Sequence, residues 1–199
     1  MKKLSLLAIG ITTAFFSFSQ NPGKFGIKAG LNIASLKIEN FDNTDSRLGF
    51  HGGLFAHIHL APQWALQPEL LYSAEGGKLD FGNGEEATFK NDYINIPVML
   101  QYMFDNGFRI EAGPQLGLLA SSKVEDQNGV EDDAKDSFKS TNVSIGFGLN
   151  YLTHSGFGLG GRYNLGVSNI AEGSGDTKGR VFQISLFYMF DHMHKAKSQ

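Results

Sequence analysis

The sequence predicts an all-β protein, an eight-stranded antiparallel up-and-down transmembrane β-barrel, and three observations support this prediction. Eight segments alternate apolar with polar residues over more than the length of an ordinary strand. Short turns and long polar connections alternate between these segments, as in outer-membrane barrels. No apolar run reaches about eighteen residues, so a bundle of membrane helices is not expected.

The alternation is clearest between Ile94 and Phe104, where every even-numbered residue is apolar. One face of this segment is therefore apolar over about eleven residues, the length that a tilted strand needs to cross a bilayer. Apart from two glycines and two prolines (Gly52, Gly161, Pro68 and Pro114), the apolar face of the eight segments consists of apolar residues and carries no charge. We expect strands at residues 24–34, 49–60, 64–76, 92–104, 108–119, 142–152, 157–167 and 180–190.

The composition of the other face decides which face lies inside the barrel. Its residues are mostly small, glycine-rich or paired in charge, unlike the Lys/Glu coat of a soluble surface. A soluble barrel such as a lipocalin would turn its apolar face inward. We therefore expect the apolar face to point outward to lipid and the polar face to fill the interior. Prolines 68, 97 and 114 are expected to lie at bulges or bends, because each removes a ladder donor.

The connections and the aromatic residues predict the orientation. Tight turns are expected at 61–63, 105–107 and 153–156, and long polar loops at 35–48, 77–91, 120–141 and 168–179. The acidic loop 120–141 is expected to be solvated. An even number of strands places both chain ends on the short-turn, periplasmic side. Aromatic residues cluster at the strand ends and predict two girdles at the membrane interfaces. The alternative explanation is the general preference of aromatic residues for strands. The residues are Phe25, Trp64, Phe108 and Phe157 at one rim, and Phe50, Tyr72, Tyr163 and Phe182 at the other.

Composition divides the chain into three parts. Residues 1–19 combine Lys2 and Lys3 with an apolar stretch and small residues, and predict a secretory signal peptide. Residues 20–190 are the expected outer-membrane β-barrel domain, and 191–199 a short polar tail. The chain contains no cysteine, which excludes disulfides and lipoprotein anchoring. A net charge of −3 without a basic run indicates that nucleic acid is not a partner.

Five short motifs in order along the chain resemble those of the PorT-like outer-membrane β-barrel family. They are KFGIKAGLN at 24–32, QPELLYS at 67–73, YINIP at 93–97, AGPQ at 112–115 and the terminal aromatic Phe190. The resemblance covers nearly all of the expected mature chain and implies an outer-membrane barrel. It also implies, as an alternative role, an accessory component of an envelope protein-secretion system, although a role does not transfer on fold alone. One departure is that the chain continues from Asp191 to Gln199, where family members commonly end.

Inward-facing polar residues are the candidates for chemistry. An eight-stranded barrel is only wide enough to be filled by side chains, so Glu69, Glu111, Arg109 and Arg162 are expected to neutralise one another. A proton or ion path is the alternative. The predicted polar network of the lumen is Gln67, Glu69, Arg109, Glu111, Gln115 and Arg162, with Asn95, Gln101, Asn150, Asn164 and Gln183 on the same face.

No catalytic, cofactor-binding or metal-binding residue is predicted. His51, His57 and His59 share one strand face, but a His-x-His pair is not a complete metal site, and we expect these side chains to fill the lumen or its mouth. A lipid-modifying enzyme would need a serine beside a histidine on the lipid face, which the expected outward set lacks. The sequence therefore favours a non-enzymatic structural or interaction role through the extracellular loops, with outer-membrane lipid, lipopolysaccharide, and envelope or secretion-system proteins as partners; lipid modification stays a third hypothesis.

Overall fold

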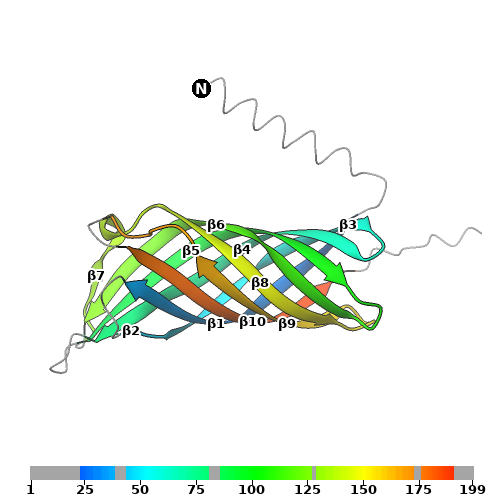
Figure 1. Ribbon diagram of the computed structural model, residues 1–199. Coiled ribbons are helices and arrows are strands. Elements are labelled where there is room, and N and C mark those ends of the chain that lie inside the picture. Colours follow the sequence, from blue (N-terminus) through cyan, green and yellow to red (C-terminus); the bar gives the residue numbers. More distant parts are fainter. Residues whose placement is uncertain (1–22, 39–43, 81–85, 127–128, 173–175, 191–199) are drawn as a thin grey trace, which may run out of the picture.

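The computed structural model is a β-barrel, and it describes residues 23–38, 44–80, 86–126, 129–172 and 176–190 (Figure 1). The expected signal peptide and the tail 191–199 lie outside the described residues. None of the helices in these ranges is long and apolar enough to cross a membrane. The elements are β1 (Lys24–Ile38), β2 (Thr44–Asp45), β3 (Arg47–Ala61), β4 (Trp64–Asp80), β5 (Glu86–Met103), β6 (Phe108–Asp126), β7 (Glu131–Asp133), the 3-10 helix η1 (Lys135–Ser137), β8 (Thr141–Leu152), β9 (Phe157–Gly166) and β10 (Thr177–Met189).

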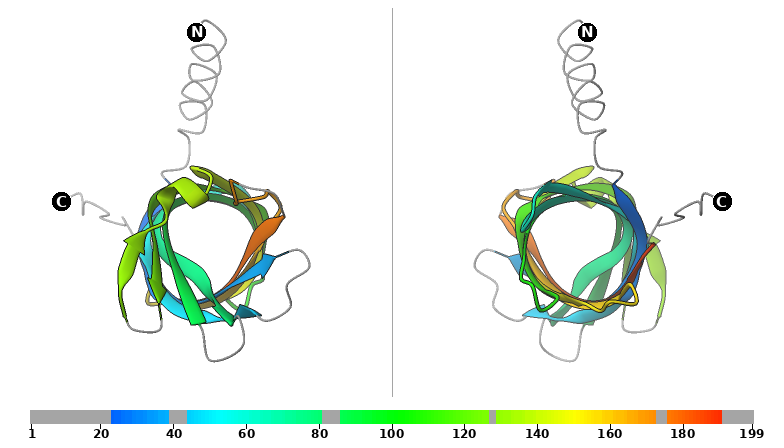
Figure 2. Two further views of the ribbon diagram at one scale, coloured as in Figure 1. Left: turned by 90° about the vertical axis from the view of Figure 1, so that its left-hand side faces the viewer. Right: turned by 90° about the vertical axis from the view of Figure 1, so that its right-hand side faces the viewer.

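Eight of these strands close into a ring, which confirms the predicted fold (Figure 2). The strands of the ring, in order, are β1, β3, β4, β5, β6, β8, β9 and β10. Each pairs with the next one along the chain, and every pairing is antiparallel. The ring closes where β1 pairs with β10, from Gly26 opposite Met189 to Ile38 opposite Thr177. The short strands β2 and β7 pair with β4 and β6, respectively. The result is an up-and-down barrel in which the only free edges of the described sheet are short.

Tight turns join the strands at one end of the barrel. Gly107 and Gly156 adopt φ values of 90° and 89°, which favour glycine. A Cβ atom at Gly107 would also lie 2.6 Å from the carbonyl oxygen of Leu152, so the neighbouring turns approach closely. Strand β1 begins and β10 ends at this same end (Figure 1), as the even strand count requires.

The outer wall of the barrel is apolar. Leu186 is 69% exposed and Leu149 is 65% exposed, and residues on alternate positions of every strand of the ring share this exposure. A soluble monomer rarely exposes a continuous apolar surface of this size. The outward face therefore agrees with the predicted strand phase and with a lipid environment.

Aromatic rings follow both rims of this apolar belt. At the short-turn end, neighbouring rings touch in series, with centroids 4.7–5.3 Å apart: Trp64–Tyr102, Tyr102–Phe104, Phe108–Tyr151, Phe157–Tyr188 and Tyr188–Phe190. At the other rim, Phe50 and Tyr72 pack at 5.7 Å, and Tyr163 and Phe182 are exposed. These two rows form the girdles that amphipathic rings make at membrane interfaces.

The strands extend further on the long-connection side than predicted. Residues 77–91 and 120–141 were expected to be loops, yet β4 continues to Asp80, β5 begins at Glu86 and β6 continues to Asp126. The expectation of a solvated loop at 120–141 is also wrong, because Ala134 and Phe138 are buried. Both differences have the same physical reason, an apolar cluster inside this end of the barrel. The local sequence of these segments does not reveal this cluster. Its buried members are Leu36, Tyr93, Leu119, Ala134, Phe138 and Ile170, with Ile38, Phe89 and Val124 packed against them.

The three strand prolines do not cause register shifts. Pro68 lies opposite Val98, and three residues further along the same ladder Leu71 lies opposite Asn95, so the register is unchanged. Shifts occur instead between Asp92 and Tyr93 and between His59 and Ala61. The expected proline bulges are therefore absent from these ladders, and strand pairing continues beyond each proline in the same register.

Candidate functional site

Four charged residues meet inside the barrel, because each lies on the inward phase of its strand. They are Lys28 on β1, Glu69 on β4, Glu111 on β6 and Arg162 on β9, and each is at most 5% exposed. Arg162 donates from Nη1 and Nη2 to the two carboxylate oxygens of Glu69 at 2.8 and 2.7 Å, and from Nε to Glu111 Oε1 at 2.7 Å. Lys28 Nζ donates to Glu69 Oε1 at 2.7 Å. Two acids and two bases thus balance in charge.

Neutral amides complete the coordination of both carboxylates. Gln67 Nε2 donates to Glu69 Oε1 at 2.7 Å, and Gln101 Nε2 donates to Glu111 Oε2 at 2.8 Å. Gly148, directly across the β6–β8 ladder from Glu111, leaves room for the Glu111 side chain. A Cβ atom at Gly148 would lie 2.7 Å from Glu111 Oε1. The bidentate Arg162–Glu69 geometry fixes both side chains, and Glu69 accepts four hydrogen bonds in all, whereas Glu111 accepts two.

A second layer of hydrogen bonds lies on the neighbouring strands. His51 Nδ1 lies 2.8 Å from Asn32 Oδ1, and His51 Nε2 lies 2.9 Å from Ser185 Oγ. Gln183 Nε2 donates to the same Asn32 oxygen at 3.0 Å, and Asn164 Nδ2 donates to Gln183 Oε1 at 3.0 Å. All five residues are buried, so this layer joins β1, β3, β9 and β10 across the interior.

Apolar clusters occur at both ends of the polar interior. Towards the short turns, Phe55, Phe187 and Met189 are buried together, with Leu152 packed against them. Towards the long connections lies the apolar cluster that contains Leu36, Phe138 and Ile170. Side chains of the wall therefore contribute to the interior at both ends, and Ala134 and Phe138 join them at the long-connection end.

The structure brings four of the six predicted network residues together. Gln67, Glu69, Glu111 and Arg162 share the contacts above. Gln115 is buried nearby, but its Oε1 has no partner among the described residues. Arg109 is half-buried near the short-turn end, opposite Met103 and Asn150, and lies outside the ion pairs of the cluster within the described ranges.

Lys28 takes the place expected for Arg109, and sequence reasoning missed it. The signal was available, since Lys28 shares the inward phase of β1 with Gly30 and Asn32. The three histidines do not form one group. His51 contacts Asn32 and Ser185, whereas the rings of buried His57 and exposed His59 pack edge to face at 4.7 Å. Within the described ranges, no group of three or more His, Cys, Asp or Glu residues could hold a metal ion.

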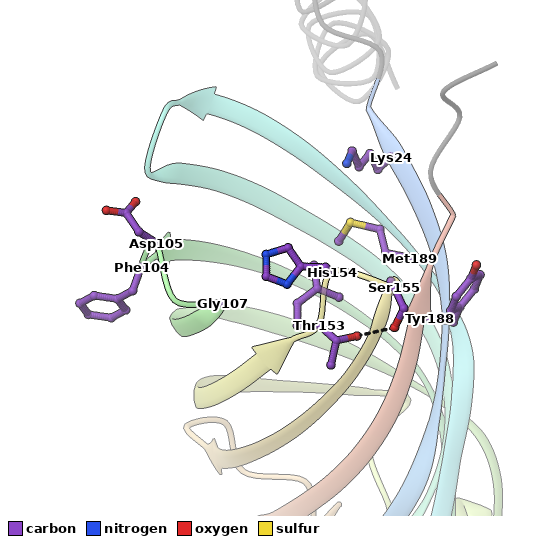
Figure 3. A pocket seen from close by; sticks show the side chains of 11 residues that line it. Lys24, Phe104, Asp105, Gly107, Thr153, His154, Ser155, Tyr188 and Met189 are labelled. Carbon is purple, nitrogen blue, oxygen red and sulfur yellow. Dashed lines mark hydrogen bonds between the residues drawn. The ribbon is translucent and has the colours of Figure 1, made fainter. Parts of the chain in front are cut away.

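A pocket of about 300 Å³ opens at the short-turn mouth (Figure 3). Lys24, the turn 104–107 and the turn 153–156 line it, together with Met189. Thr153 Oγ1 bonds to Ser155 Oγ at 2.8 Å and donates to the carbonyl oxygen of Phe157 at 2.7 Å. These hydroxyls support the turn and are not paired with a base, so the mouth lacks the geometry of an activated nucleophile.

Comparisons with known proteins place this barrel in a family. The family model described as "Outer membrane protein beta-barrel domain" matches residues 18–172. The chain belongs to this family. No curated protein matches it in sequence. The outer-membrane barrel resembles Neisserial surface protein A with a TM-score of 0.56 and 15% identity, over 83% of this chain and 97% of that one. It resembles Ail, the attachment invasion locus protein of Yersinia pestis, with a TM-score of 0.50 and 15% identity, over 84% and 99%.

These comparisons fix the fold and the compartment. Membership of the family, the apolar belt and the two aromatic rows agree on a transmembrane barrel of the outer membrane. At 15% identity, the two solved structures support the fold alone.

Proposed function

We propose that this outer-membrane barrel is a non-enzymatic protein with a structural or interaction role, exercised through its extracellular side. The observation that carries the proposal is the bonding inside the barrel. Glu69, Glu111 and Arg162 are inward groups capable of acid–base or ion chemistry, and they bind one another. Glu75, a further buried carboxyl, accepts a hydrogen bond from Asn95 at 2.7 Å. A carboxylate that accepts several charged hydrogen bonds is a poor general base, because its ionised form is strongly stabilised.

The extracellular side offers the surface for interaction. Strands β4, β5 and β6 rise beyond the outer aromatic row, and β7 adds a short edge strand to them (Figure 1). Lys90 and Lys123 donate to Glu131 at 2.7 Å each, and Lys90 also pairs with Glu125. The hydrogen bonds from Lys123 and Lys90 lower the pKa of Glu131 to about 2. This projecting sheet is charged, exposed and ordered by its own ion pairs, as suits a contact surface.

The strongest enzymatic rival is the row of Ser185, His51 and Asn32, which has the distances of a nucleophile, a base and an orienting group. Ser185 is 6% exposed, His51 is 2% exposed and Asn32 is fully buried, all on the inward face. A lipid substrate lies on the other side of the barrel wall. We infer that these hydrogen bonds hold strands together and do not perform acyl transfer.

A fluorophosphonate probe tests the distinction. The folded protein in lipid vesicles should not be labelled at Ser185 and should release no fatty acid above the level of Ser185→Ala. Labelling of Ser185, or lipid release that Ser185→Ala abolishes, would overturn the non-enzymatic proposal. Photo-crosslinking from Thr88 or Asp132 on the projecting sheet should meanwhile capture envelope components in cells, whereas a crosslinker at lipid-facing Leu149 should capture none of these proteins.

The narrower assignment to PorT-like barrels suggests a particular partner. The five motifs that carry the resemblance support an accessory role in an envelope protein-secretion system. Co-purification of secretion-machinery subunits with the full-length protein, lost when the crosslinking surface is altered, would support this role. Capture of unrelated envelope proteins would direct the search to another process.

A further inference from the structure

Three cations stand together on the outer wall where β1 meets β10. Lys37 lies directly opposite Lys178, and Ser35 lies directly opposite Arg180. The next pair inward along the barrel is Ile33 opposite Phe182, both on the outward face. Because side chains alternate with period 2, Lys37, Lys178 and Arg180 share the outward face with this apolar pair. Lys37 and Lys178 lie where β1 and β10 are longer than predicted, and Arg180 is the first residue of the predicted strand 180–190, so the outward face becomes charged just beyond the apolar belt.

The depth of this basic patch matches that of lipid headgroups. Phe182 and Tyr163 belong to the outer aromatic row, with 41% and 38% exposure. Two residues along a strand span about 6.6 Å. Arg180 therefore lies one such step, and the Lys37–Lys178 pair two steps, outside the row that marks the membrane interface.

The charges of the patch are poorly compensated. Like charges directly opposite each other on two strands are destabilising. Among the described residues, Lys178 makes one ion pair, with Asp176 at 3.8 Å, and Lys37 and Arg180 make none. On the projecting sheet, by contrast, Lys90 and Lys123 each reach Glu131 at 2.7 Å. A repulsive arrangement at headgroup depth points to an anion supplied from outside the chain.

We propose that Lys37, Lys178 and Arg180 bind the phosphate groups of an outer-leaflet lipid, the phosphorylated glycolipid of lipopolysaccharide. The planar fork of Arg180 suits a phosphate, and the two lysines add point charges on either side. The Ser35 hydroxyl, opposite Arg180, adds a neutral donor. Below the patch, Ile33, Phe182 and Tyr163 offer an apolar wall for acyl chains, which a soluble polyanion would not use. The inference rests on the proposed orientation, with the long connections outside.

Native mass spectrometry of the full-length mature protein in detergent provides the test. The probe is bisphosphorylated lipid A, compared with the same lipid after removal of both phosphates. The triple variant Lys37→Gln/Lys178→Gln/Arg180→Gln should bind the phosphorylated probe about a hundredfold more weakly, since each cation near an anionic surface contributes about fivefold. A control that removes two exposed cations elsewhere on the long-connection side, Lys78→Gln/Lys135→Gln, should bind like the wild type.

Three results would overturn the assignment. They are equal binding by the triple variant and the wild type, equal binding of both lipid probes, and displacement of the lipid by a soluble sulfated polysaccharide at equal phosphate and sulfate concentration. If the triple variant does not show the heat-modifiable gel band of a folded barrel, Arg180→Gln alone should still lose about fivefold in affinity. Failure here would leave the non-enzymatic proposal intact, since the fluorophosphonate and crosslinking results do not depend on these cations.

Discussion

Arg162→Met removes the side chain that joins the two buried carboxylates. The guanidinium donates two hydrogen bonds to Glu69 and one to Glu111, at 2.7–2.8 Å. After the substitution, Lys28 and Gln67 still reach Glu69, whereas Glu111 keeps the neutral amide of Gln101. The interior would then carry one uncompensated negative charge, which a narrow lumen solvates poorly.

The magnitude follows from these contacts. Hydrogen bonds to charged groups contribute about 1.5–3 kcal/mol each, so three of them set an upper range that the remaining partners reduce. Breaking a buried ion pair from one side typically costs about 3–5 kcal/mol. We expect the free energy of unfolding to fall by about 3–5 kcal/mol. Urea unfolding in lipid vesicles measures it, because Trp64 is the single tryptophan and its fluorescence reports on the rim of the barrel.

The matched control is Arg109→Met, which makes the same chemical change outside the ion-pair cluster. This substitution should cost about 1 kcal/mol or less. Adding Glu111→Gln to Arg162→Met should restore part of the loss, because the unpaired charge is removed. Equal effects of the two arginine substitutions, or an unchanged unfolding midpoint for Arg162→Met, would refute the placement of Arg162 at the centre of the network.

Three further predictions concern the wall, the interior cluster and the projecting sheet. Leu186→Arg, at a 69% exposed position in the belt, should lower the free energy of unfolding in vesicles by about 2–4 kcal/mol, whereas Val130→Arg, exposed outside the belt, should not change it. Phe138→Ala should speed amide exchange of residues 134–140, because Phe138 anchors this connection in the apolar cluster. Amide exchange of β8 and β9 should stay unchanged. Faster exchange throughout the barrel would contradict a local role of Phe138. Glu131, with its pKa lowered to about 2, contributes stability that is present above its unfolded pKa and is lost as pH falls through about 2. Amide-exchange protection of residues 123–126 should therefore persist at pH 4 in the wild type and be lost in Glu131→Gln. Loss of this protection at pH 4 in the wild type would contradict the ion pairs.

The sequence could predict which residues face inward, because alternation with period 2 is written into every strand. Glu69 and Arg162 are far apart in the chain, yet the strand phases alone place both inside a ring only wide enough for side chains. The same reasoning chose Arg109 and missed Lys28, since the phase gives the face of a residue and not its height along the barrel. Height depends on the tilt and stagger of all eight strands, which no single segment encodes.

The strand ends on the long-connection side could not be read from local composition. Residues 77–91 are rich in Gly, Asp and Asn and look like a turn, yet Gly77 to Asp80 continue β4, and Lys90 belongs to β5. Pairing extends there because Phe89 and Val124 pack against residues from distant connections, such as Phe138 and Ile170. Packing in a tertiary cluster of this kind outweighs weak strand propensity. The strand segments that the cluster stabilises carry no periodic pattern in the sequence that would predict them.

Planar-bilayer recording tests most directly whether the barrel interior is closed by its own side chains. Purified wild-type protein inserted into a bilayer should give no stable conductance steps at either polarity, because the charged network spans the interior and apolar clusters lie at both ends. Insertion is verified in the same sample by protease protection of the belt. Regular ion-conducting steps from the inserted wild-type barrel would contradict the closed interior and favour a transport role.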